Sequence, residues 1–154
     1  MVNDPQILAQ RAATAMLARD PASQNLGIAL VAIRPGYAHM RMTVRADMLN
    51  GHATCHGGYI FMLADSAFAF ACNSYNQITV GAGCTIDYIV PALEGDQLDA
   101  EATEQAIAVN GKSGVYDVKV TNQNAFTVAL FRGKSHRVGG TLLDLTFEAS
   151  KENT

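Results

Sequence analysis

The chain has 154 residues, of which 49% are hydrophobic and 16% charged, whereas charged residues make up about 25% of an average globular protein. This balance excludes an intrinsically disordered chain, and the net charge of −3 argues against a nucleic-acid-binding domain, which is usually basic. The length fits a single domain, and the scarcity of charge indicates an oligomer in which part of the surface is covered.

The N-terminal part of the chain is expected to form one helix and a β-hairpin. Residues 4–19 carry apolar side chains at helical spacing, behind an acidic cap and a proline at a plausible first helical position. An apolar strand is predicted over residues 26–33, followed by a turn at 34–36. In residues 37–46 apolar and polar side chains alternate strictly, which is typical of a half-buried antiparallel strand, so we expect the two strands to pair.

A long apolar helix is predicted next. An irregular stretch with several glycines, residues 47–58, leads into residues 59–75, which are rich in Ala, Phe and Leu and contain neither Gly nor Pro. Because apolar residues occur on every side of this segment, we expect a helix that is buried nearly all round.

The rest of the chain is expected to be β-structure. Strands are predicted over residues 78–90, 97–109, 114–121 and 126–138. A helix that is apolar all round needs a sheet curled around it. We therefore predict an α+β fold of the hotdog type, in which a curved antiparallel sheet wraps one long buried helix, with an additional N-terminal helix. A single domain is expected over residues 1–140, followed by a polar and flexible C-terminal tail over 141–154.

Asp65 is the only charged residue between Asp47 and Asp87, a stretch in which about six would be expected at the chain's own frequency. Aspartate is a poor helix former, an unpaired carboxylate is costly to bury, and no Lys or Arg stands three or four residues away to pair with it. A carboxylate facing solvent or an interface, paired with a distant base, is one interpretation. We favour the other, a desolvated carboxylate with a raised pKa that acts as general base or nucleophile.

The sequence His56-Gly57-Gly58 stands at the start of the predicted helix. Backbone N–H groups at a helix N-terminus are unpaired and partly positive, and glycine allows a ligand to approach closely. The segment is therefore suited to polarise a carbonyl or to hold an oxyanion, although a plain turn into a helix would look the same. The spacing of eight from Gly57 to Asp65, about two helical turns, strengthens the functional interpretation.

Metal sites and disulfides are not indicated. His52 and His56 are four residues apart, but no Glu follows His52, so a zinc-protease motif is excluded and we expect no metal. Cys55, Cys72 and Cys84 are odd in number and form no CxxC pair, which favours reduced, mostly buried thiols. The chain has no apolar run long enough to span a membrane and no signal-peptide core, so we expect a cytoplasmic protein that binds no membrane.

Basic residues gather near the C-terminus of an otherwise acidic chain. The basic cluster consists of Arg132, Lys134, His136 and Arg137, with Lys112, Ser113 and Gly114 from the preceding hairpin turn. A phosphate-binding site and a solvated strand edge explain this cluster about equally well.

Several runs of this sequence resemble one family. Residues 56–74 (HGGYIFMLADSAFAFACNS) resemble the helix motif of PaaI-type thioesterases of phenylacetic acid degradation, in the 4-hydroxybenzoyl-CoA thioesterase superfamily of hotdog proteins. Further matches are 84–91 (CTIDYIVP), 114–118 (GVYDV) and 128–137 (VALFRGKSHR). The resemblance extends over about residues 4–140. It implies hydrolysis of phenylacetyl-CoA or its ring-hydroxylated forms, with CoA present only as part of the substrate and no separate cofactor.

The resemblance also implies roles for four residues. Asp65 corresponds to the acid that activates water, or attacks directly, at the thioester carbonyl. Gly57 corresponds to the glycine whose backbone N–H polarises that carbonyl. Asn50 and His56 correspond to polar residues that line the site and orient the thioester or the water. In this family the two subunits of a dimer share each active site, which implies that Gly57 and Asp65 of one site can come from different chains. The family commonly pairs two such dimers, so the resemblance implies a homotetramer.

Other consequences of the resemblance concern specificity. Phe61, Met62 and Phe68 suit an aryl group, although they suit a core equally well, and the CoA phosphates are expected at the basic cluster. A serine or threonine that assists the acid in some animal relatives aligns near Gly81, so Thr85 or a bound water would take that part. Two other functions stay open: a hotdog enoyl-CoA hydratase or dehydratase, and a non-catalytic acyl-CoA-binding protein.

Overall fold

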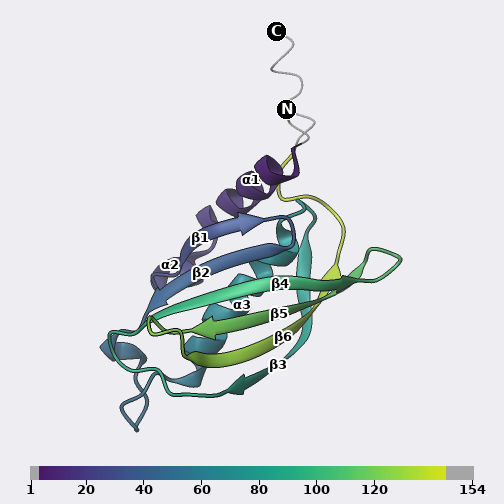
Figure 1. The fold of residues 1–154 in the computed structure, drawn as a ribbon. Helices are drawn as coiled ribbons and strands as arrows, with labels where there is room; N and C mark the ends of the chain where they lie inside the picture. The colour runs from purple at the N-terminus through teal and green to yellow at the C-terminus, as the bar shows by residue number, and fades with distance from the viewer. Residues whose placement is uncertain (1–3, 145–154) are drawn as a thin grey trace.

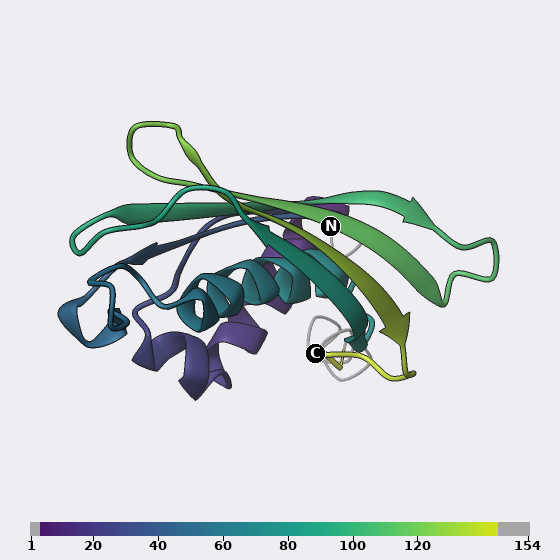
Figure 2. The ribbon, with the colours of Figure 1, turned by 90° about the horizontal axis from the view of Figure 1, so that it is seen from below.

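The computed structural model describes residues 4–144. In it, six strands form one antiparallel sheet in the order β1-β2-β4-β5-β6-β3, and helix α3 lies under the curved sheet, as Figures 1 and 2 show. The elements are α1 (Pro5–Ala18), α2 (Pro21–Asn25), β1 (Ala29–Arg34), β2 (Tyr37–Thr43), the short 3-10 helix η1 (Ala46–Met48), α3 (Gly57–Asn73), β3 (Thr79–Tyr88), β4 (Gln97–Ile107), β5 (Ser113–Thr121) and β6 (Thr127–Arg137). The α+β arrangement predicted from the sequence is confirmed.

The N-terminal region contains one helix more than the sequence indicates. Helix α1 begins as predicted, with the Asp4 side chain accepting a hydrogen bond from a backbone N–H of the first turn. The additional helix, α2, has only five residues, and Asp20 caps it by accepting a hydrogen bond from the N–H of Ser23 (3.0 Å). Because α2 takes up the residues before the hairpin, the strand predicted over 26–33 begins only at Ala29.

Helix α3 is covered on nearly all sides, as its apolar composition predicts. From Tyr59 onward none of its residues is exposed. Its partly covered stripe includes Phe61, Asp65 and Ala69, which are spaced by four and therefore share one face. These three residues border strand β3, so the one charged residue of the helix lies beside the edge of the sheet.

Strand β3 is an edge strand that pairs only with β6 and runs along α3 in the opposite direction. At one end the N–H of Thr79 donates to the side chain of Asn73 (2.9 Å), and at the other end the hydroxyl of Tyr88 donates to the carbonyl of Gly57 (3.0 Å). Most of the strand is exposed in the protomer. An exposed edge strand that carries no charge over most of its length, here residues 79–86, is a template for pairing with another chain.

The inner face of the sheet packs on α3 around Phe68. The ring of Phe68 meets the ring of Tyr116 edge-on, with 5.6 Å between centroids, and it lies so close to Gly133 that an added Cβ would come within 2.8 Å of it. Glu104 accepts hydrogen bonds of 2.9 Å from the hydroxyls of both Tyr116 and Tyr75. This cluster ties the C-terminal end of α3 to strands β4 and β5.

The predicted C-terminal tail over 141–154 lies outside the described residues from 145 onward. Within the described part, Leu143 exchanges two backbone-to-side-chain hydrogen bonds with Asn76 (2.8 and 3.3 Å). Among residues 4–144, none of the helices has both the length and the apolar character needed to cross a lipid bilayer.

Candidate active site

The N-terminal end of α3 presents one unpaired backbone donor. The ring nitrogen Nδ1 of His56 accepts a hydrogen bond from the N–H of Gly58 (2.9 Å), and the carbonyl of His56 accepts one from the N–H of Tyr59 (3.0 Å). The N–H of His56 itself donates to the carbonyl of Met48 (2.8 Å). Within the described residues the N–H of Gly57 has no partner. It is therefore available to a ligand, at the positive end of the helix dipole.

The loop before α3 forms a cavity beside this donor. Asn50 shapes the loop, since its Oδ1 accepts hydrogen bonds from the N–H groups of His52 (2.9 Å) and Thr54 (3.3 Å). Asn50, Gly57 and Tyr88 line a common cavity of about 370 Å³. The Nδ2 amino group of Asn50 has no protein partner in the part of the chain that the structure describes, so it can donate to a ligand.

Asp65 lines a different cavity, of about 530 Å³, between α3 and β3. Its walls include Phe61, Phe68, Gly81 and Cys84. Over residues 4–144 the Asp65 carboxylate takes part in no hydrogen bond or ion pair, and partial burial raises its pKa above the ordinary aspartate value. Such a carboxylate is suited to accept a proton from water near neutral pH.

Gly57 and Asp65 are not brought together within one protomer. They are eight residues apart on one helix, and a rise of 1.5 Å per residue separates them by about 12 Å along its axis. Different residues line their two cavities. Because a donor and a base must both lie within about 3–3.5 Å of the reacting atoms, the Gly57 N–H and the Asp65 carboxylate of one protomer are too far apart to act on the same bond.

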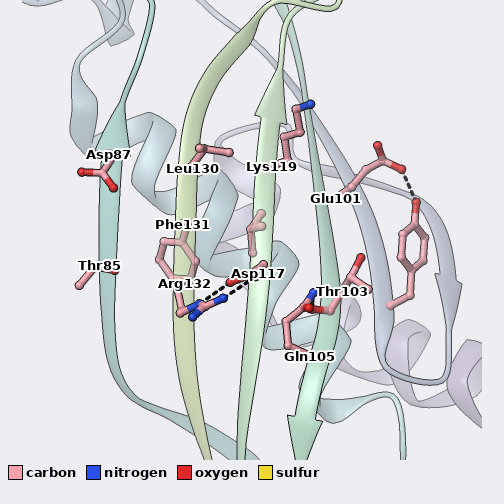
Figure 3. Close-up of a pocket in the computed structure, with 12 residues that line it drawn as sticks. Thr85, Asp87, Glu101, Thr103, Gln105, Asp117, Lys119, Leu130, Phe131 and Arg132 are labelled. Carbon is pink, nitrogen blue, oxygen red and sulfur yellow. Dashed lines mark hydrogen bonds and ion pairs between the residues drawn. The ribbon is translucent and has the colours of Figure 1, made fainter.

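The side chains that β3 presents to α3 are set by a register shift. β3 has an irregularity between Gly81 and Gly83, which moves the alternation of all later side chains by one position. Cys84 and Tyr88 consequently lie on the helix side of the sheet. Thr85 lies on the outer face, in a trough whose lining also includes Asp87, Asp117 and Arg132 (Figure 3). Of the two predicted alternatives for assisting the acid, Thr85 or a bound water, Thr85 is therefore excluded, and the hydroxyl-bearing residue at the Asp65 cavity is Thr79.

Two of the three side chains expected to contact an aryl group line the Asp65 cavity. These are Phe61 and Phe68. Met62 does not, because the residue after Phe61 is turned by about 100° around the helix. It lines another cavity, of about 440 Å³, together with His56. His56 thus stands beside the cavity of Gly57 rather than within it.

Tyr88 is the residue of this region that the sequence did not indicate. Its hydroxyl and ring both contact Gly57, from 31 residues further along the chain. Simple alternation along β3 offered no signal, since the register shift decides which side of the sheet Tyr88 occupies. The one usable signal was the glycine at the helix start, which implies that something approaches the backbone closely there.

The basic side chains of β6 lie on one face of the sheet, since Arg132, Lys134 and His136 are exposed and alternate with buried residues, but they line different cavities on that face. Lys134 and His136 line a cavity of about 350 Å³ together with Ser113 and Gly114. Strand β6, which carries the cluster, lies between β5 and β3. The interpretation of the cluster as a solvated strand edge is therefore wrong, because the exposed basic side chains project from an interior strand.

The other three residues of the cluster have different surroundings. Arg132 bonds the carboxylate of Asp117 on the outer face (2.6 and 2.8 Å; Figure 3) and holds the pKa of Asp117 below its ordinary value. The guanidinium of Arg137 lies over the ring of Tyr75, 5.7 Å from its centroid. Lys112 contributes its backbone carbonyl, which accepts a hydrogen bond from the N–H of Arg137 (2.8 Å).

The cysteines are all free thiols. Burial raises the pKa of Cys55 to about 11 and that of Cys72 to about 12, so both are protonated at neutral pH and are poor nucleophiles. In the described part of the chain, no group of three or more His, Cys, Asp or Glu side chains is placed to hold a metal ion.

Comparison with known proteins identifies the family of the chain. The family model of the thioesterase superfamily matches residues 52–129, a range that includes both Gly57 and Asp65. The acyl-coenzyme A thioesterase PaaI of Escherichia coli (strain K12) is 50% identical over 130 residues, which cover 84% of this chain and 91% of that protein. The chain therefore belongs to the thioesterase superfamily.

Solved structures show the same fold. The E. coli PaaI protein from the phenylacetic acid degradation operon is 47% identical, with a TM-score of 0.87 over 90% of this chain and 99% of that one. The protein smu.793 from Streptococcus mutans UA159, solved with bound acetyl-CoA, is 26% identical, with a TM-score of 0.70 over 74% of this chain and 90% of that one. The expected hotdog fold and the expected enzyme class, a thioester hydrolase, are confirmed.

Proposed function

We propose that the protein hydrolyses phenylacetyl-CoA, or ring-hydroxylated phenylacetyl-CoA, to the free acid and CoA. The proposal rests on the two half-sites of α3: an unpaired amide donor at Gly57 and an unpaired, half-buried carboxylate at Asp65. The names of the E. coli relatives support an acyl-CoA substrate and a role in phenylacetate degradation. Phe61 and Phe68 offer an apolar wall to a phenyl ring beside Asp65.

A two-fold dimer would unite the half-sites. Two α3 helices related by a two-fold axis across their partly covered stripes can run antiparallel, so that Gly57 of one protomer lies opposite the partner's Asp65. Strand β3 runs along that stripe, is exposed, and carries no charge over residues 79–86. Pairing of two β3 strands would make one continuous sheet across the dimer. We propose that two such dimers form a homotetramer.

In the proposed mechanism the thioester carbonyl accepts a hydrogen bond from the N–H of Gly57, and the helix N-terminus stabilises the negative charge that develops on its oxygen. The partner's Asp65 takes a proton from the attacking water. The tetrahedral intermediate then expels CoA as the C–S bond breaks, and the thiolate takes up a proton. Water thus adds its OH to the acyl carbon and its H to sulfur. Asn50 and His56 orient the thioester and the water.

Binding of the CoA moiety is proposed at the cavity lined by Lys134, His136, Ser113 and Gly114. Cationic and hydroxyl groups there suit phosphate oxygens. CoA enters as part of the substrate, and the amide donor and the carboxylate base both come from the protein, so the proposal includes no further cofactor. A cytoplasmic location is also proposed, because CoA esters are intracellular substrates and the three free thiols suit a reducing compartment.

Subunit complementation tests the proposal. The wild type should release CoA thiol from phenylacetyl-CoA. Asp65→Asn removes the base. Gly57→Pro removes the donor N–H at the first helical position, where the backbone angle of proline fits a helix, and it also displaces the ring of Tyr88. Each variant alone should be inactive. In equal co-expression half of the dimers are mixed, and each mixed dimer holds one intact site. We expect recovery of about a quarter of wild-type activity.

Three outcomes would contradict this proposal. Mixed dimers, verified by mass spectrometry, that stay inactive would refute the shared site. A wild type that binds phenylacetyl-CoA without hydrolysing it would favour an acyl-CoA-binding protein. Addition of water to an enoyl-CoA, without thiol release, would favour a hydratase.

A further inference from the structure

Tyr88, the last residue of β3, contacts the first residue of α3 in two ways. Its hydroxyl donates a hydrogen bond to the carbonyl of Gly57 (3.0 Å). Its ring lies against the same residue, since a Cβ added to Gly57 would stand 3.0 Å from Cζ and 3.1 Å from the hydroxyl oxygen of Tyr88. The ring therefore occupies the space that a side chain at position 57 would need.

These contacts complete the anchoring of two successive peptide groups. The group that joins Gly57 to Gly58 is held at its carbonyl by Tyr88 and at its N–H by His56 Nδ1 (2.9 Å). The preceding group is held at the carbonyl of His56 by the N–H of Tyr59 (3.0 Å). Within the described residues, the N–H of Gly57 is the one polar group of these two peptides without a partner.

Glycine makes this anchoring necessary. It has the widest backbone freedom of any residue, so an unanchored Gly57 would let its N–H point in several directions. A donor stabilises a developing oxyanion best when its direction is fixed before the reaction, because no reorganisation is then required. Tyr88 both requires the glycine, by filling the space of its side chain, and removes the freedom that the glycine introduces.

We propose that Tyr88 is a positioning residue for thioester hydrolysis, which fixes the direction of the Gly57 N–H through its hydrogen bond to the Gly57 carbonyl. The inference rests on the proposed function, in which that N–H polarises the thioester carbonyl. It predicts an effect on the transition state more than on substrate binding, and therefore on kcat more than on KM.

The first test removes the hydroxyl alone. Tyr88→Phe keeps the ring and should lower kcat for phenylacetyl-CoA about five- to tenfold while changing KM less than about twofold. Tyr37→Phe is the matched control, because its hydroxyl also bonds a neighbour, Glu101, but at the outer-face cavity that contains Arg132 and Asp117. It should retain wild-type kcat. An unchanged kcat in Tyr88→Phe, or a rise in KM alone, would overturn the inference.

The second test addresses the ring. Gly57→Ala should lower kcat sharply in the wild type, because the new Cβ displaces the ring of Tyr88. In a Tyr88→Ala background the same substitution meets no ring, so it should lower kcat by a smaller factor. If Gly57→Ala lowered kcat by the same factor in the wild type and in Tyr88→Ala, the ring of Tyr88 would not be the reason for glycine at position 57.

A third measurement needs no substrate. Amide hydrogen exchange at Gly58, whose N–H donates to His56 Nδ1 and belongs to the peptide group that Tyr88 anchors, should become several times faster in Tyr88→Phe and stay unchanged in Tyr37→Phe. If the wild type fails to hydrolyse phenylacetyl-CoA, the proposed function fails, and faster exchange would still establish the anchor. If the wild type is active but neither exchange nor kcat responds to Tyr88→Phe, the inference fails alone.

Discussion

At Asp65, partial burial acts on a carboxylate that has no partner in the part of the chain that the structure describes. Its pKa in the folded state is therefore raised above the value in the unfolded chain. As pH rises between these two values, the unfolded state loses its proton first, so folding loses stability over that window. The ionised Asp65 carboxylate, which the proposed mechanism needs, therefore lowers the free energy of unfolding near neutral pH.

Replacing this side chain should separate activity from stability. We expect Asp65→Asn to lower kcat at least about a hundredfold, since a general base contributes that much or more, while its melting temperature at pH 7 equals or exceeds that of the wild type. In the wild type, kcat/KM should rise with pH through a pKa above the ordinary aspartate range. Thiol-release kinetics over a pH series and calorimetry measure both effects.

Asp87→Asn is the control for that substitution. Asp87 lies in the outer-face trough of Figure 3, away from α3, so its loss should leave kcat unchanged. A fully active Asp65→Asn variant with lowered stability would show that Asp65 is a structural residue.

At the scale of elements, two glycines allow Phe68 to fill the space between α3 and the sheet. An added Cβ would come within 2.8 Å of its ring at Gly133 and within 3.3 Å at Gly81. The ring is 2% exposed and also packs against Phe131 and Tyr116. Because this space is fully occupied, small side chains are required where β3 and β6 cross the middle of the helix.

Gly133→Ala should therefore destabilise the protein through overpacking. We expect a loss of about 1–3 kcal/mol in the free energy of unfolding, measured by urea denaturation. Gly51→Ala is the control, because an added Cβ there meets nothing within 4 Å, and it should change stability little. Equal stability of the two variants would mean that the Phe68 ring moves aside without cost.

The sequence predicted these elements well where the pattern is local. The alternation in β2, β4 and β5 matches their burial, and the apolar run predicted α3 to within two residues at each end. The helix starts earlier than predicted because His56 caps it, which allows two glycines of low helix propensity to form its first turn. The side of the sheet that each side chain of β3 faces was not predictable, because it depends on the register shift between Gly81 and Gly83.

At the scale of the whole molecule, the scarcity of charge from residue 48 to 86, where Asp65 is the one charged residue, coincides with α3 and the exposed edge strand β3. An exposed surface of this kind is suited to be covered by a second copy. The half-sites of Gly57 and Asp65 lie on the same surface, so assembly and activity should be lost together.

Gly83→Glu tests that link. An added Cβ at Gly83 meets nothing within 4 Å in the protomer, so the fold should tolerate the side chain while its charge opposes pairing of β3. Light scattering should show a mass close to the 16.4 kDa of one chain, with an unchanged circular dichroism spectrum and no thiol release. Val109→Glu, in the exposed β4–β5 turn, should remain assembled and active. An assembled and active Gly83→Glu would exclude β3 as the interface.

By itself, the sequence determined the order of the elements, the buried central helix, and the two residues that stand out on it. Asp65 stands out as a lone charge and Gly57 as a glycine at a helix start, and both are local features that composition and spacing reveal. Only the tertiary structure decided that they lie in separate cavities, that Tyr88 anchors Gly57, and that the basic cluster projects from an interior strand of the sheet. These depend on strand register and on contacts between residues distant in the chain, which local periodicity does not encode.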